Sequence, residues 1–471
     1  MNGLQLLRCA VFVLYGLAYV PVGLAAPEAA TERYIRAEMR EQGIPGIALG
    51  VLRHGRPVYL KGFGVATLEH PVPVGVQTRF QIGSIGKQFT AVAVMLLARD
   101  KRLSLDDPLS KYLPEIPASW GGVTLRLMLN HQSGIPQLTP PQHDLLDLHH
   151  DYTDAEYLRL AASLPLDFEP GTDAAYSDTA YVLLGFVIGR VGGEFYGDLL
   201  TQRVFRPLRM LRTRIVSDAD IIPGRASGYE RDAAGRLRNQ EYVSPALNRT
   251  ADGSLYSTVI DLARWDAALY GEQILPQADL QRMWRIDAHR DGRRPLLHYG
   301  YGWEINSLRG HAVIEYDGNW QGFQAAVARY PDRDLTVIVL TNLALCRAQR
   351  LAHTVAGLFD PQLARYPDII RDDAPQRTAN FRALLETVRA GRLDPQEFSA
   401  AVRDRFAQQW ARSLARDLTA VGALRGVRLI GEGAGRSERI YRVELEQMVE
   451  YFTVRHDGGG LIEDIDLSHE Y

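Results

Sequence analysis

Apolar runs near the start of the chain and again before residue 360 predict the strands of a sheet. Residues 47–52 and 58–63 are apolar, and the polar segment 53–57 between them contains glycine and proline. This arrangement predicts a β-hairpin around a short turn. Strand-like runs return much later in the chain, at residues 311–316, 323–330 and 335–341.

The segment between these strands has mainly helical patterns. Residues 84–99 are almost entirely apolar beyond the first turn, and a helix that is apolar on every side is buried. Residues 100–300 carry helical spacing broken by proline and glycine, and a further helix is predicted at about 346–359. We therefore expect an α/β (α+β) domain over residues 26–359, with an antiparallel sheet built from both ends and a helical region beside it.

The rest of the chain has the pattern of a second, smaller domain. Residues 360–377 are rich in proline and aspartate and predict a linker. Residues 378–471 are expected to form a small α+β domain, because helical spacing at 380–418 is followed by strand alternation at 427–430, 439–444, 450–455 and 461–467. Two domains also suit a chain of 471 residues, since a single core stops growing near roughly 250–300 residues.

Composition excludes several classes of partner. The formal net charge is −3, so we expect no basic surface for nucleic acid or anionic lipid. No histidine or cysteine spacing is typical of a metal site, and no cofactor is expected. The two cysteines are Cys9 and Cys346, and Cys9 lies in a segment predicted to be removed.

Residues 1–25 have the pattern of a cleaved secretory signal. Arg8 precedes an apolar run over residues 9–20, and small residues at Gly23 and Ala25 suit cleavage after Ala25. The alternative is an anchor that stays in the membrane, although the run is short for a span. We expect an exported protein, periplasmic or secreted, without a membrane span after cleavage.

Lysine is rare in this chain, and its placement is informative. Only four of the 53 Lys and Arg residues are lysines, and Lys87 lies three positions after Ser84 at the start of the buried helix. Positions i and i+3 share a helix face, so the two side chains can meet. Lysine, unlike arginine, can lose its proton when buried. The pair alone leaves two interpretations open: an activated serine nucleophile, or a helix-capping serine followed by a lysine that reaches to solvent.

Further motifs follow Ser84 and Lys87 in a fixed order. They lie at residues 83–87, 103–109, 129–136, 170–172, 176–178, 181–185, 253–258 and 316–323. As a set, over about residues 33–358, they resemble the serine β-lactamase and penicillin-binding protein family, especially its class C-like branch with D-aminopeptidases and esterases. The resemblance implies a β-lactamase-like fold.

The resemblance also implies roles for particular residues. Ser84 would form the acyl-enzyme, Lys87 would shuttle its proton, and Tyr176 would act as base or as proton donor to the leaving group. Gly318 would lie on the strand edge that closes the substrate pocket. The backbone N–H groups of Ser84 and Asn319 would form an oxyanion hole, in which each donor is worth roughly 3–4 kcal/mol.

Two positions depart from the family pattern, and both are expected to line the substrate site. Asp178 stands where the family has asparagine, and Tyr316 stands where it has lysine or histidine. An ionised Asp178 would hold Lys87 protonated and shift the role of base to Tyr176, unless Asp178 is protonated or turned away. The pocket becomes less positive, so we expect preference for substrates without a carboxylate, such as simple esters.

The surroundings of Ser84 also bear on other classes of function. No Gly-x-Ser-x-Gly motif surrounds Ser84, because residue 82 is isoleucine, and His131 is interpreted as structural. The sequence favours a serine hydrolase that cleaves an ester, amide or lactam in a small-molecule or peptide substrate. A β-lactamase, a D-Ala-D-Ala carboxypeptidase or a D-aminopeptidase are alternatives, as is a non-catalytic module that binds peptidoglycan or a partner. The oligomeric state is left open.

Overall fold

The structure is a computed structural model of the full chain. It describes residues 27–470 except 140, 141, 296, 365–368, 401, 404–414, 416, 417, 419–421, 433–436, 447 and 448. The predicted signal at residues 1–25 lies outside the described residues, as does much of the predicted helical segment at 380–418.

One seven-stranded sheet is the centre of the larger domain, in the order β3-β2-β1-β12-β11-β10-β9. Its strands are β1 (Gly46–Arg53), β2 (Arg56–Thr67), β3 (Val72–Pro73), β9 (Glu304–Leu308), β10 (His311–Trp320), β11 (Phe323–Tyr330) and β12 (Leu335–Thr341). β1 pairs antiparallel with both β2 and β12, with Ile47 opposite Thr341. The sheet is therefore built from both ends of the domain, as the sequence predicted.

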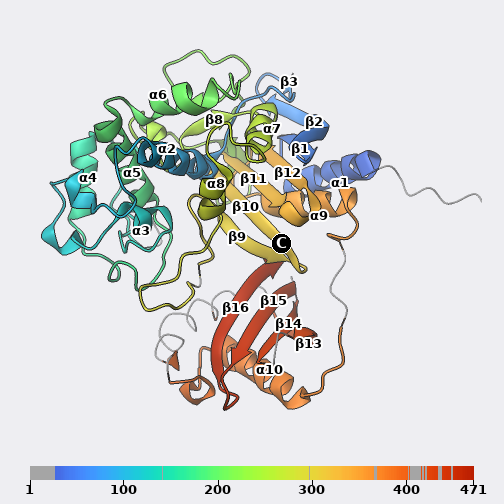
Figure 1. The fold of residues 1–471 in the computed structure, drawn as a ribbon. Helices are drawn as coiled ribbons and strands as arrows, with labels where there is room; N and C mark the ends of the chain where they lie inside the picture. Colours follow the sequence, from blue (N-terminus) through green and yellow to red (C-terminus); the bar gives the residue numbers. More distant parts are fainter. Residues whose placement is uncertain are drawn as a thin grey trace, which may run out of the picture.

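Both faces of this sheet are covered, which explains why its central strands are apolar at consecutive positions. Ile47, Leu49 and Val51 face α1 (Pro27–Gln42) and α9 (Ala348–Phe359), in a core that includes Leu351 of α9. Their neighbours Ala48 and Leu52 belong to the core on the opposite face. Figure 1 shows α1 and α9 on one side of the sheet and the helical region on the other.

The helical region lies between β3 and β9 in the sequence. Its helices are α2 (Lys87–Arg99), α3 (Leu125–Leu129), α4 (Asp154–Ala162), α5 (Asp178–Gly192), α6 (Tyr196–Leu200), α7 (Val259–Ala268) and α8 (Gln277–Met283). Two small sheets accompany them, one of β4 (Phe80–Gln81), β8 (Leu255–Ser257) and β5 (Arg214–Ile215), the other of β6 (Tyr229–Arg231) and β7 (Leu237–Asn239). α2 is buried along nearly its whole length and packs against α5.

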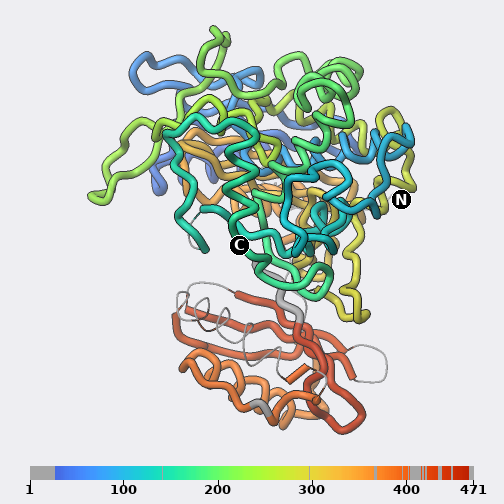
Figure 2. Tube along the Cα trace, turned by 90° about the vertical axis from the view of Figure 1, so that its left-hand side faces the viewer, coloured from blue at the N-terminus to red at the C-terminus, as the bar shows by residue number. Residues whose placement is uncertain are grey.

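The C-terminal part has a core of its own. Four antiparallel strands form its sheet, β13 (Leu424–Glu432), β14 (Glu438–Leu445), β15 (Val449–His456) and β16 (Ile462–Glu470). α10 (Pro375–Arg389) packs Phe381 against Tyr441 and Phe452 of this sheet. Figure 2 shows α10 along one face of the four strands. α10 begins at Pro375, inside the segment predicted as a linker.

The fold class is the one predicted, an α/β domain with antiparallel sheet followed by a small α+β unit. Among the described helices, none is both long and apolar enough to span a membrane. Cys346 is buried and is not in a disulfide.

Candidate active site

Ser84 lies in a short 3₁₀ turn, Gly83–Gly86, which leads directly into α2. Backbone segments pack closely against this turn on two sides. A side chain at Gly318 of β10 would lie 1.9 Å from the carbonyl oxygen of Ile82, and Gly83 has φ +52°, a conformation that favours glycine. These contacts fix Ser84 between β10 and α2, with its hydroxyl only partly covered.

Lys87 is completely buried in the first turn of α2, and its Nζ has three acceptors. It donates to Ser84 Oγ at 3.0 Å, to Asp178 Oδ1 at 2.5 Å and to the carbonyl oxygen of Asp252 at 2.7 Å. An ammonium group has three N–H donors, so these neighbours satisfy all of them. The sequence alternative of a lysine that reaches to solvent is therefore wrong.

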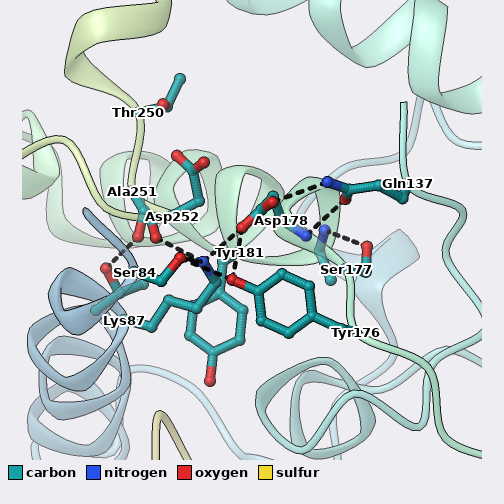
Figure 3. A network of polar contacts seen from close by, with 12 residues as sticks. Ser84, Lys87, Gln137, Tyr176, Ser177, Asp178, Tyr181, Thr250, Ala251 and Asp252 are labelled. Atoms are coloured by element: carbon teal, nitrogen blue, oxygen red, sulfur yellow. Dashed lines mark hydrogen bonds and ion pairs between the residues drawn. The ribbon is translucent and has the colours of Figure 1, made fainter. Parts of the chain in front are cut away.

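Tyr176 and Asp178 stand at the beginning of α5. Ser177 is the N-cap of that helix and accepts a hydrogen bond from Ala180 N, while its own N–H donates to His131 Nδ1. The cap directs the residues on either side of Ser177 toward Ser84 (Figure 3). Tyr176 Oη lies 2.8 Å from Ser84 Oγ and donates to Asp178 Oδ1 at 2.9 Å.

The protonation states follow from these contacts. Burial opposes ionisation of Asp178, but Lys87 and hydrogen bonds from Lys87, Gln137 and Tyr176 hold the pKa of this carboxyl below its ordinary value. Burial and the Asp178 charge raise the pKa of Tyr176 well above its ordinary value. Asp178 is thus an ionised carboxylate turned toward Lys87, and Tyr176 is a neutral phenol rather than a phenolate.

Gly318 and Asn319 bring the edge of β10 against the serine turn. A side chain on Gly83 would lie 2.8 Å from Asn319 N, and one on Gly318 would lie 3.2 Å from Ser84 N. The backbone nitrogens of Ser84 and Asn319 therefore both lie where β10 meets the serine turn. Their closeness is compatible with two oxyanion-hole donors, and that role stays a prediction.

Tyr316 contacts Tyr176, the tyrosine that is bonded to Ser84. Tyr316 is buried, and its hydroxyl is 2.8 Å from Tyr299 Oη. His131 packs against the rings of Tyr176 and Tyr299. Burial and Lys87 lower the pKa of His131 to about 3, so its ring is neutral and acts as an acceptor that positions Ser177.

Sequence reasoning missed two residues of this site. Gln137 donates to Asp178 Oδ2 at 2.8 Å and accepts from Asp178 N at 2.8 Å. Asp252 offers its carbonyl oxygen to Lys87, and its side chain also lies beside the site. Each is adjacent to a motif that was recognised, 129–136 or 253–258, and that adjacency was the available signal.

A buried Ser-x-x-Lys pair, a tyrosine bonded to the serine and a sheet edge against the serine turn define the class of active-site serine proteins with this fold. The chain belongs to the Beta-lactamase family, whose model matches residues 31–358.

The chain is similar to several known proteins. It is 29% identical over 302 residues to "Penicillin-binding protein 4*" of Bacillus subtilis, covering 61% of this chain and 66% of that protein. It is 28% identical over 291 residues to "Beta-lactamase" of Escherichia coli, covering 60% and 72%. The match to "Protein flp" of Staphylococcus aureus spans 62% of that protein's length. The chain thus spans slightly less than two thirds of the first of these relatives.

Solved structures agree on the fold. The octameric penicillin-binding protein homologue from Pyrococcus abyssi superposes with a TM-score of 0.61 at 23% identity, covering 94% of this chain and 98% of that one. A D-stereospecific amidohydrolase from Streptomyces gives a TM-score of 0.59 at 24% identity, covering 71% and 98%. At these identities the likeness concerns the fold alone.

Proposed function

We propose that the protein hydrolyses esters or amides through an acyl-Ser84 intermediate. The observation that carries this proposal is the closed set of hydrogen bonds joining Ser84, Tyr176, Asp178 and Lys87. Lys87 donates to Ser84 Oγ, and Tyr176 donates to Asp178. The Ser84 hydroxyl therefore donates its proton to Tyr176 Oη, because among these groups only that oxygen is free to accept a hydrogen bond from it.

The reaction follows from this direction of donation. Ser84 Oγ attacks the substrate carbonyl carbon, its proton passes to Tyr176 Oη, and the phenol proton passes to Asp178 in the same step. The carbonyl oxygen becomes an oxyanion held by the N–H groups of Ser84 and Asn319. As the C–O or C–N bond breaks, the proton returns through Tyr176 to the leaving group.

Deacylation runs through the same groups. Water attacks the acyl carbon and gives its proton to the Tyr176–Asp178 pair, and that proton restores the Ser84 hydroxyl as the acid leaves. Lys87 stays cationic throughout and stabilises the negative charge near Ser84. In this scheme Asp178 is the final proton acceptor, a role that an asparagine at that position would be unable to take.

We further propose that the preferred substrates carry no carboxylate. Asp178 adds a negative charge beside the nucleophile, and Tyr316 supplies a neutral phenol where the related motif has a cation. Asp317, next to Tyr316, is a further carboxyl and not a cation, and burial and Glu315 raise the pKa of this carboxyl to about 6. β-Lactams and peptides that end in D-alanine carry a carboxylate, whereas simple esters and amides do not. The name of the amidohydrolase structure is consistent with an acyl-transfer reaction on amides.

A fluorophosphonate probe tests the nucleophile directly. Intact mass spectrometry of the purified protein is expected to give a single adduct, and the Ser84→Ala variant is expected to give none. Absence of an adduct on the folded wild-type protein would favour the binding-module alternative. Turnover of p-nitrophenyl esters is then compared with turnover of a penicillin, and a penicillin rate equal to the ester rate would contradict the proposed substrate preference.

A further inference from the structure

A small cavity of about 80 Å³ is lined by Asp178, whose carboxylate is bonded to Lys87 and Tyr176, and by Asp252. Its other walls include Gln137, Thr139 and the indole of Trp320, together with leucines and Val182. Of the residues that line it, the two that carry an ionisable carboxyl are Asp178 and Asp252, and none is arginine or lysine. The cavity is therefore acidic and otherwise largely apolar.

Asp252 is poorly compensated within the folded chain. Its Oδ1 is buried and has no hydrogen-bond partner among the described residues, while Thr250 and its own N–H interact with the carboxylate. Figure 3 shows the Asp252 carboxylate pointing away from Lys87, whose three N–H donors are already used. Burying a carboxylate without a partner is costly, so an oxygen left in this state calls for an explanation.

The charges around the cavity indicate what would satisfy that oxygen. Asp178 and Asp252 contribute two carboxylates, and Lys87 contributes one ammonium group that is bound to Asp178. The Asp178 charge and burial both act against ionisation of Asp252. A second cation in the cavity would restore the balance.

We infer that this cavity receives a primary ammonium group on the acyl part of the substrate, an inference that rests on the proposed function. Asp178 is bonded to Tyr176 and Lys87, and each of these is bonded to Ser84 Oγ. Asp178, one wall of the cavity, is thus two hydrogen bonds away from the nucleophile. This separation suits an amino group one or two carbons from the scissile carbonyl. The leucine and valine walls suit methylene groups, whereas a hydrated divalent ion would need more oxygen ligands.

Two pairs of matched esters test this inference. The p-nitrophenyl esters of glycine and β-alanine are compared with those of propionic and butyric acid, in which a methyl group replaces the ammonium. We expect kcat/KM to favour the ammonium member of at least one pair by about tenfold. In the Asp252→Asn variant this ratio is expected to fall about fivefold or more, because the unpaired carboxylate is removed.

The Asp144→Asn variant is the matched control. It removes the same charge from an exposed position, and we expect it to keep the wild-type ratio. Comparison of ratios between variants cancels the intrinsic reactivity of each ester. A ratio unchanged in Asp252→Asn, or a wild-type preference for the neutral esters, would overturn the inference while leaving the proposed function intact.

A measurement on the wild-type protein covers the case in which Asp252→Asn does not fold. n-Propylammonium is expected to inhibit turnover of p-nitrophenyl butyrate competitively and more strongly than 1-propanol. Equal inhibition by the two compounds would contradict the inference. Failure of every ester together with failure of the fluorophosphonate adduct would instead refute the proposed function, and the inference with it.

Discussion

The stability of the Asp252→Asn variant at two pH values is the most direct physical test of this site. Burial, followed by the Asp178 charge, raises the pKa of Asp252 from 3.8 to about 6. The folded chain therefore binds a proton at Asp252 more tightly than the unfolded chain does. The stabilising contribution of the protonated form is complete below pH 4, and it is lost as the pH rises through 6.

The size of the effect follows from the same shift. Two pKa units correspond to about 3 kcal/mol of unfolding free energy at pH 8. Asparagine has nearly the same shape and no charge. The difference in unfolding free energy between the variant and wild type is therefore expected to be more favourable to the variant at pH 8 than at pH 4, by up to about 3 kcal/mol.

Urea unfolding followed by tryptophan fluorescence measures this difference. Five of the six tryptophans lie between residues 120 and 320, so the signal reports mainly on the larger domain. Asp144→Asn serves as the control and is expected to show no such pH-dependent gain. If Asp252→Asn were stabilised equally at pH 4 and pH 8, Asp252 would not be a strained carboxylate, and the reasoning would be refuted.

Three further predictions concern neighbouring residues. Tyr176→Phe is expected to lower kcat for a neutral ester about 10²–10⁴-fold with little change in KM, because the phenol transfers the proton but does not bind the substrate. An unchanged kcat would contradict this role. Gly318→Ala is expected to destabilise the protein by about 1–3 kcal/mol and to reduce turnover, since its methyl group would overlap the Ile82 carbonyl, whereas Gly75→Ala, with open space around it, is expected to be tolerated in the same melting assay. The pKa of His131 is about 3 in the folded chain against an ordinary value of 6.5, so the free energy of unfolding falls by up to about 5 kcal/mol as the pH drops from 6.5 to 3. Asparagine has no such titration and tolerates the positive φ at this position. His131→Asn is therefore expected to weaken the acid sensitivity measured in urea titrations.

The central strands could be predicted from the sequence because burial on both faces makes them continuous apolar runs. β1 and β12 match their predicted positions within one residue. β10 was predicted to end at residue 316, but it continues to Trp320. The missed residues are Asp317 to Trp320. The first three are polar or glycine and form the edge beside Ser84, so the hydrophobic pattern stops where the site begins.

The candidate site was predictable only as far as its motifs extend. Ser84, Lys87, Tyr176, Asp178, Gly318 and Asn319 are brought together, although their chemical roles remain predictions. The direction of proton donation was not predictable, because it depends on whether Asp178 turns toward Lys87. Gln137 and Asp252 act through contacts with residues far away in the sequence, and no local pattern distinguishes them from other polar residues in loops.

The pairing of β1 with β12 has a consequence for synthesis of the chain. β1 leaves the ribosome long before β12, so its pairing partner on that side is missing until residue 341 has been made. Asn319 on β10 is likewise held in place by β11 and β12, while Ser84 is made much earlier. A nascent chain therefore holds its serine without the opposing sheet edge until β10, β11 and β12 have been made, and it acquires a complete site only when nearly all of the domain exists.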